Sequence, residues 1–183
     1  MDSFCHLLYI FRSFFVKKHN FFGMKHIGKT KLLFVCLGNI CRSPAAEGIF
    51  NHLVRKHHLQ ERFEADSAGI GHWHVGDLPD KRMRAHGAKH GYQFNSRARQ
   101  FSPSDFNRFD MIIAMDQQNA SYIRSMATSP DDLRKVHLMA EYLRHHPMHR
   151  HIPDPYYGSD QQFEMVIELL EDACQGLLDS LTT

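Results

Sequence analysis

Residues 31–44 read KLLFVCLGNICRSP, and this stretch decides the fold that we expect for the chain. Its short apolar run, residues 32–35, is typical of a buried strand, and residues 45–59 have the apolar spacing of a helix. The stretch therefore predicts a strand, a tight loop and the start of a helix. A thiol stands at the entrance of the loop and a guanidinium at its exit, namely Cys36 and Arg42.

The loop has the features of an anion-binding site. Ser43 is a good N-cap residue, and Pro44 suits the first position of a helix. The loop amides and the positive end of the helix dipole would then converge on one point, and Gly38 allows the tight path that this requires. Arg42 adds a planar fork of donors that suits two oxygens of a phosphate. The same positive field favours a thiolate at Cys36, which would be a nucleophile directed at phosphorus.

A cysteine and an arginine at this spacing also occur by chance, because the chain has four cysteines and 22 lysines and arginines. Alone, the pair favours a buried structural cysteine at the end of a strand. Gly38, Asn39, Ser43 and Pro44 reverse that preference, because they stand in a strand–loop–helix context. The segment VCLGNICRSP resembles the active-site loop of the low-molecular-weight protein tyrosine phosphatases, and the resemblance covers about residues 31–178.

The composition is that of one soluble domain. The chain has 183 residues, of which 43% are hydrophobic and 23% are charged. A formal net charge of +2, without a block of lysine and arginine, argues against a nucleic-acid partner. The four cysteines show neither a zinc pattern nor a dense disulfide pattern, which favours a reducing compartment and predicts a cytoplasmic protein.

Beyond the first helix, strands and helices alternate. Strands are expected at residues 63–68, 109–115 and 136–139, and helices at residues 81–90 and 116–126. A long amphipathic final helix has its apolar face on Phe163, Val166, Ile167, Leu170, Ala173, Cys174, Leu177 and Leu181. This order predicts an α/β, three-layer fold with a central, mostly parallel four-stranded sheet flanked by helices on both faces. Active sites in such folds lie beyond the carboxyl ends of the strands, where Cys36 is expected.

Residues 1–29 lie outside the resemblance. They carry an apolar face on Phe4, Leu8, Phe11 and Phe15, which is compatible with a helix that docks on a surface. Charged residues interrupt this segment, so it predicts neither a transmembrane segment nor a secretory signal. We expect a poorly ordered N-terminal extension at residues 1–29 and a phosphatase domain at residues 30–183.

A general acid is needed to expel an alkoxide or phenolate. The candidate is Asp154, in the segment IPDPYYG at residues 152–158, although an Asp-Pro pair by itself indicates only a turn. Because DPYYG resembles the acid loop of the family, the resemblance implies the role of general acid and base for Asp154. It also implies that Cys36 attacks phosphorus. The expected phosphate-binding residues are Leu37, Gly38, Asn39, Ile40, Cys41 and Arg42.

The resemblance implies supporting roles for other polar residues. Ser43 would donate a hydrogen bond to the nucleophilic sulfur, and Asn39 would hold the loop in shape. Ser67 and His90 fall at positions that resemble the partners of Asn39, although a turn serine and a helix-end histidine explain them as well. Asp116 also matches a position near the site, and an N-cap role accounts for it equally.

The expected substrate pocket is apolar, and the resemblance places Leu37, Ile40, Trp73, Tyr156 and Tyr157 around its entrance. Such walls suit a flat aryl phosphate. Trp73 would ordinarily be a core residue, but its Gly/His-rich segment, GHWHVG, favours an exposed wall. Ile40 favours phosphotyrosine, because relatives that act on phosphoarginine tend to have Thr at that place. One departure from the family is Ser96, where relatives often have His.

Cys41 is adjacent to Arg42, and in several relatives the equivalent thiol forms a reversible disulfide with the nucleophile. A small loop-filling residue is an equal alternative. His145, His146, His149 and His151 crowd the segment before the acid loop, but no cysteine or carboxylate pattern accompanies them. We therefore predict no metal and no cofactor.

The predicted activity is hydrolysis of a phosphotyrosine-containing protein with inorganic phosphate as product, and the oligomeric state stays open. Three alternative functions compete with this prediction. A phosphoarginine phosphatase is disfavoured by Ile40, and an arsenate reductase by the lack of any cysteine between Cys41 and Cys174. A non-catalytic phosphotyrosine-binding module would need no nucleophile.

Overall fold

The computed structural model describes residues 28–183. The predicted N-terminal extension, with its apolar face, lies outside this range except for its last two residues. The boundary between extension and domain therefore stays a prediction. Within the described range, no helix combines the length and the apolar character that crossing a membrane requires.

A sheet of four strands forms the middle layer, in the order β2-β1-β3-β4. Its strands are β1 (Thr30–Cys36), β2 (Phe63–Gly69), β3 (Met111–Ala114) and β4 (Val136–Leu138). Every neighbouring pair is parallel, which confirms the predicted sheet. The register pairs Cys36 with Gly69 and Val35 with Ala114, so the carboxyl ends of the three longest strands meet at one edge.

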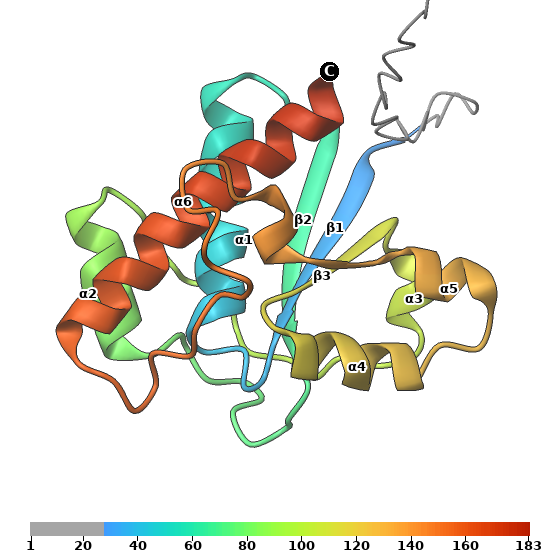
Figure 1. The fold of residues 1–183 in the computed structure, drawn as a ribbon, viewed down its shortest axis with the longest axis horizontal. Coiled ribbons are helices and arrows are strands. Elements are labelled where there is room, and N and C mark those ends of the chain that lie inside the picture. Colours follow the sequence, from blue (N-terminus) through green and yellow to red (C-terminus); the bar gives the residue numbers. More distant parts are fainter. Residues whose placement is uncertain (1–27) are drawn as a thin grey trace, which may run out of the picture.

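Helices cover both faces of the sheet (Figure 1). One face carries α1 (Arg42–Lys56), α2 (Lys81–Lys89) and α6 (Asp160–Thr182). The other carries α3 (Asp105–Arg108) and α4 (Gln117–Ser125), with α5 (Pro130–Arg134) beside them. Successive side chains of β1 serve the two hydrophobic cores in turn. Leu32 and Phe34 belong to the α1/α6 core, and Leu33 and Val35 to the other.

The observed elements differ from the predicted ones mainly at their ends. α1 begins at Arg42 and ends at Lys56, earlier than predicted. It ends there because His58 takes a left-handed conformation, with φ of 57°, and the chain turns back so that Leu59 N–H donates to Val54 O. Three short elements were not predicted, namely α3, α5 and the 3-10 helix η1 (Met139–Tyr142), because four or five residues show no usable periodicity.

Candidate active site

Cys36 ends β1, and its side chain is only 3% exposed. The sulfur accepts the backbone N–H of Asn39 at 3.3 Å and lies 3.0 Å from Ser43 Oγ. Hydrogen bonds to sulfur are strongest when the sulfur is anionic. The loop therefore surrounds the thiol with groups that suit a thiolate.

The path of the loop depends on the backbone of Asn39 and on the absence of a side chain at Gly69. Asn39, and not Gly38, takes the left-handed conformation, with φ of 56°. Asparagine tolerates this region better than most residues. Gly69, at the end of β2, lets the loop come close, because a Cβ there would lie 2.9 Å from the carbonyl carbon of Gly38 and 3.0 Å from Asn39 N.

Ser43 is not the N-cap that we predicted. α1 already begins at Arg42, and its N-cap residue, Cys41, makes no side-chain capping bond. The Ser43 hydroxyl is instead engaged inside the site, where it contacts the Cys36 sulfur, accepts from Asn39 Nδ2 at 2.9 Å and lies 3.2 Å from Ala68 O. These partners at the end of the neighbouring strand and in the loop replace the capping contact.

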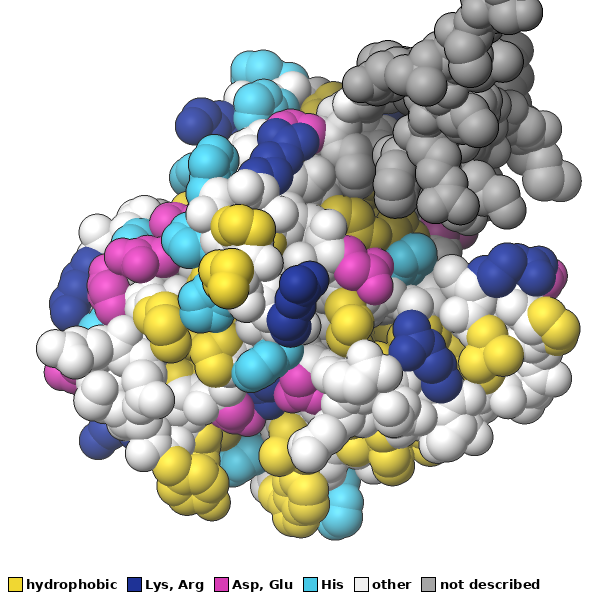
Figure 2. Space-filling model, viewed as in Figure 1, with side chains coloured by type: hydrophobic (Ala, Val, Ile, Leu, Met, Phe, Trp, Pro, Cys, Tyr) yellow, Lys and Arg dark blue, Asp and Glu magenta, His cyan; other side chains and the backbone are white. Residues whose placement is uncertain are grey.

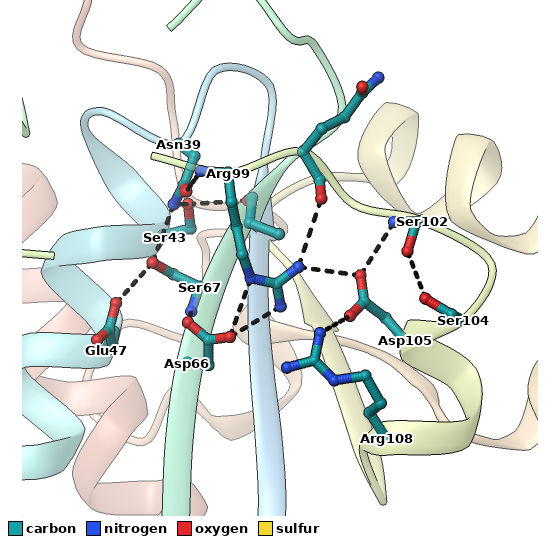
Figure 3. A network of polar contacts seen from close by, with 12 residues as sticks. Asn39, Ser43, Glu47, Asp66, Ser67, Arg99, Ser102, Ser104, Asp105 and Arg108 are labelled. Atoms are coloured by element: carbon teal, nitrogen blue, oxygen red, sulfur yellow. Dashed lines mark hydrogen bonds and ion pairs between the residues drawn. The ribbon is translucent and has the colours of Figure 1, made fainter. Parts of the chain in front are cut away.

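Asn39 is the centre of a polar network under the loop (Figure 3). Its Nδ2 donates to Ser43 Oγ and Ser67 Oγ, each at 2.9 Å, and its Oδ1 accepts the backbone N–H of Arg99 at 2.9 Å. Ser67 in turn donates to Glu47 Oε2 at 2.6 Å. The structure thus places Asn39, Ser43 and Ser67 together, and their supporting role in catalysis stays a prediction.

The expectation that His90 joins this network is wrong. His90 follows α2, and its Nε2 lies 2.5 Å from Glu164 Oε1 while its Nδ1 lies 3.2 Å from Glu171 Oε1. Both ring nitrogens are therefore engaged with α6. The hydrogen bond with Glu164 raises the pKa of His90, although burial opposes it, and Glu171 adds to the rise. His90 joins two helices and does not shape the loop.

Arg42 lies at the other end of the loop and is almost fully buried. Its Nη1 donates to Asp116 Oδ2 at 2.6 Å and to Ile152 O at 3.2 Å, and its Nη2 donates to Asp154 Oδ2 at 2.5 Å. Burial alone would lower the pKa of Arg42, but Cys36 and the two carboxylates outweigh it and raise that pKa. Within residues 28–183, its buried Nε has no hydrogen-bond partner.

Asp116 and Asp154 reach Arg42 from different segments. Asp116 does both things that the sequence left open, since its Oδ1 caps α4 through Asn119 N–H at 2.7 Å and its Oδ2 holds Arg42. Asp154 has a side chain that is 40% exposed, and its Oδ1 accepts the Tyr156 N–H at 3.2 Å. The structure therefore brings the three candidate catalytic residues to one place.

Apolar side chains surround this place. Hydrophobic groups project at the lower edge of the molecule in Figure 2, where the loops after β1 and β2 lie in Figure 1. The exposed hydrophobic side chains include Leu37 after β1, Trp73 after β2, and Tyr156 and Tyr157 in the acid loop. Trp73 is 65% exposed, so it is not a core residue. Its ring lies directly over Gly71, where a Cβ would come within 1.8 Å of it. Ile40 differs from the expectation, because it is only 8% exposed and packs mainly into the core.

Sequence reasoning missed the residues that tie the loop to α2. Asp80 caps α2, and its backbone N–H donates to Ile40 O at 2.7 Å. Arg82 donates to Asp80 and to Tyr156 O, the latter at 3.0 Å, so it links α2 to the acid loop. The only sequence signal for this link was the helix start at Asp80.

The remaining candidates are placed as follows. Cys41 is a buried free thiol, and burial first, then Asp80 and Cys36, raises its pKa. His145 and His146 both contact Asp172 of α6, at 2.8 Å and 3.0 Å. In the described part of the chain, no group of histidine, cysteine and acidic side chains is arranged to hold a metal ion.

The fold and the site together define a class of protein: an α/β protein with a thiol at the base of an anion cradle, at the carboxyl edge of a parallel sheet. Comparison with known proteins agrees. The family model described as low molecular weight phosphotyrosine protein phosphatase matches residues 31–183. The chain belongs to the family of low molecular weight protein tyrosine phosphatases.

Individual relatives cover most of the chain. A putative low molecular weight protein-tyrosine-phosphatase of Synechocystis is 50% identical over 151 residues, which are 82% of this chain and 96% of that protein. The crystal structure of a protein tyrosine phosphatase from Entamoeba histolytica, with Hepes in its active site, has a TM-score of 0.81 and 42% identity, and the match covers 84% of this chain and 97% of that chain. The structure of a Drosophila arginine phosphatase has a TM-score of 0.78 and 35% identity, with 84% and 99% covered.

Proposed function

We propose that this protein hydrolyses phosphotyrosine in proteins through a phosphocysteine intermediate. The observation that carries the proposal is the buried Nε of Arg42, which lacks a partner in the described chain and lies on a guanidinium held between Asp116 and Asp154. An unsatisfied buried donor costs about 1–3 kcal/mol. A phosphoryl oxygen would satisfy it, and the fork of Arg42 suits two such oxygens.

In the first step, Cys36 Sγ forms a bond to phosphorus while the bond to the tyrosyl oxygen breaks. The amides of residues 37–42 and Arg42 bind the equatorial oxygens, and positioning and charge stabilisation of this kind supply most of phosphoryl-transfer catalysis. Asp154 gives its proton to the leaving oxygen. Its side chain is 40% exposed, so it can turn from Arg42 towards that oxygen while Oδ1 still accepts the Tyr156 N–H.

In the second step, water attacks the phosphocysteine, Asp154 takes a proton from that water, and the sulfur–phosphorus bond breaks. Ser43 Oγ, 3.0 Å from Cys36 Sγ, donates a hydrogen bond to the leaving sulfur. The product is inorganic phosphate, and the cycle needs no cofactor.

The exposed rim supports an aryl substrate, because Leu37, Trp73, Tyr156 and Tyr157 offer flat apolar contacts that a phosphoserine side chain is too short to use. We also propose a cytoplasmic location, since the described free thiols at Cys36, Cys41 and Cys174 are what a reducing compartment maintains.

Cys41 is proposed to protect the nucleophile. If a peroxide oxidises Cys36 to a sulfenic acid, the Cys41 thiol can condense with it, forming a disulfide and releasing water. A cellular thiol would then reduce the pair. The raised pKa of Cys41 keeps it protonated and unreactive until then.

A panel of phosphopeptides with one sequence and a phosphotyrosine, phosphoserine or phosphoarginine at its centre tests the function, with Cys36→Ser as the control. We expect phosphate release from the phosphotyrosine peptide at the highest kcat/KM and none with the variant. A preference for phosphoarginine would favour the activity named for the Drosophila relative. Binding of phosphotyrosine without turnover would favour a binding module.

A further inference from the structure

The polar network under the loop has a defined direction (Figure 3). Because Arg99 N–H donates to Asn39 Oδ1 at 2.9 Å, the amide nitrogen of Asn39 faces the other way and donates to Ser43 and Ser67. A hydroxyl that accepts a hydrogen bond here donates one of its own to a third group. For Ser67 that third group is Glu47, whose Oε2 lies 2.6 Å from Ser67 Oγ.

The direction matters at the nucleophile. Since Ser43 accepts from Asn39, its own proton is available to Cys36 Sγ at 3.0 Å or to Ala68 O at 3.2 Å. The backbone of Asn39, with φ of 56°, is in a region that costs energy for any residue except glycine. Its side-chain contacts must therefore hold it in place, and Glu47 anchors the far end of those contacts through Ser67.

Glu47 differs from the neutral members of this network because its charge changes with pH. It lies on α1, where Asp66 and Ser67 of β2 and Ser96 and Arg99 of the segment after α2 face it. Burial raises the pKa of Glu47, hydrogen bonds from Ser67 and Ser96 oppose this, and Asp66 adds to the rise more than Arg99 opposes it.

Water and protons can reach Glu47. A cleft of about 210 Å³ lies between α1 and residues 93–96, with Glu47 and Ser96 in its lining and the exposed Arg55 at its wall. Arg55, on the same helix as Glu47, is the other charged side chain that lines this cleft. The two serines that contact the carboxylate are uncharged and form no ion pair with it. The charge of Glu47 therefore depends on its burial, on the flanking Asp66 and Arg99, and on protons that enter from the cleft.

We propose that Glu47 is a positioning residue for catalysis: its carboxylate accepts the hydrogen bond from the Ser67 hydroxyl, which orients Asn39 and Ser43 towards Cys36 and makes turnover depend on the charge of Glu47. This inference rests on the proposed function. Glu47 touches neither substrate nor sulfur in this scheme and acts only through Ser67 and Asn39.

The sign of the pH effect follows from the contact. The ionised carboxylate is the stronger acceptor, because a charge-assisted hydrogen bond is roughly twice as strong as a neutral one. Protonation of Glu47 weakens its hydrogen bond with Ser67 and so loosens Asn39. Because the pKa of Glu47 is raised, this protonation occurs at a higher pH than that of an ordinary glutamate, whose pKa is about 4.3. Turnover should fall about tenfold as the pH drops through the raised pKa of Glu47, on top of the pH dependence that the rest of the enzyme has.

The test compares the full chain with Glu47→Gln, using p-nitrophenyl phosphate over a series of pH values. The ratio of wild-type kcat to variant kcat is taken at each pH, so that any pH dependence common to both enzymes cancels. We expect a ratio of about ten near neutral pH that falls towards one in acid. The matched control is Glu64→Gln, which removes the same charge from an exposed position on β2 and should give a ratio near one throughout.

A ratio that does not change with pH would show a merely structural role and overturn the proposal, as would a ratio near one at neutral pH. If Glu47→Gln does not fold, Ser67→Ala breaks the same relay from its other side and should lower kcat and remove the same acid inflection. A wild type that hydrolyses no phosphate ester would refute the proposed function and this inference with it. An active wild type with a constant ratio refutes the inference alone.

Discussion

Replacing Asp154 by Asn tests the candidate acid and its contact with Arg42 in one variant. Asp154 Oδ2 lies 2.5 Å from Arg42 Nη2, and Oδ1 accepts the Tyr156 N–H at 3.2 Å. Asparagine has the same shape and keeps one oxygen that can accept, so no cavity opens. The carboxyl proton and the negative charge are lost. Two measurable effects of opposite sign follow.

The first effect is on chemistry. A positioned general acid contributes roughly 10²–10⁴-fold, and this should appear in full for phenyl phosphate, whose leaving group needs a proton. For p-nitrophenyl phosphate the loss of kcat/KM should be small, because nitrophenolate leaves without a proton and kcat/KM does not include the second step, in which Asp154 is the base. The second effect is on binding. Asp154 is 40% exposed, so its ion pair with Arg42 is screened and is worth about 0.5–1 kcal/mol. Freeing Arg42 should therefore tighten phosphate binding about two- to fivefold.

The assay measures kcat/KM, which reports the first phosphoryl transfer alone, for a series of aryl phosphates with graded leaving groups, together with competitive inhibition by inorganic phosphate. Asp131→Asn on α5 is the matched control, because Asp131 pairs with Arg134 on the surface and should change neither quantity. An equal loss of kcat/KM for every leaving group would refute Asp154 as the acid. Weaker phosphate binding by Asp154→Asn would refute the competition for Arg42.

Further variants test the nucleophile, the loop and the helix pair. Cys36→Ser should abolish turnover while inorganic phosphate still binds, measured by calorimetry; chelator-sensitive turnover by this variant would contradict the mechanism. Gly69→Ala places a Cβ 2.9 Å from the backbone of Gly38, so kcat/KM should fall at least about tenfold while the melting temperature drops as for about 1–3 kcal/mol of overpacking. An active Gly69→Ala enzyme would show that the loop can move away. The raised pKa of His90 means that its contact with Glu164 stabilises the fold below the ordinary histidine pKa of about 6.5 and is lost as the pH rises through the raised value. The difference in denaturation midpoint between wild type and His90→Gln should therefore shrink with rising pH, and a constant difference would count against this linkage.

The part of the site that could be predicted from the sequence is the part that is local. Residues 31–44 hold the strand, the loop and the helix start in one continuous stretch, so the positions of Cys36 and Arg42 follow from backbone rules. The parallel sheet follows from the alternation of strands and helices. Even here, capping rules predict that Ser43 caps α1, whereas its hydroxyl contacts Cys36 and Asn39 in the site.

The contacts that join distant segments could not be predicted. Arg99 reaches Asn39 across 60 positions of sequence, and its side chain is held by Asp66 and Asp105 through bonds of 2.9 Å and 3.1 Å. No periodicity marks such a residue. His90 shows a different error. Its position resembles that of a partner of Asn39, but its ring contacts Glu164 instead.

The contact between Arg42 and Asp154 affects how a phosphate group binds in the site. A buried guanidinium needs anionic partners when no phosphate is bound, and Asp154 supplies one of them at 2.5 Å. An arriving phosphate dianion competes for the same donor and repels the carboxylate. We infer that binding itself releases Asp154 from Arg42, while Tyr156 N–H, 3.2 Å from Oδ1, keeps it beside the leaving oxygen. Asp116 does not exchange in this way, because its other oxygen is fixed on the start of α4, so Arg42 keeps its orientation throughout.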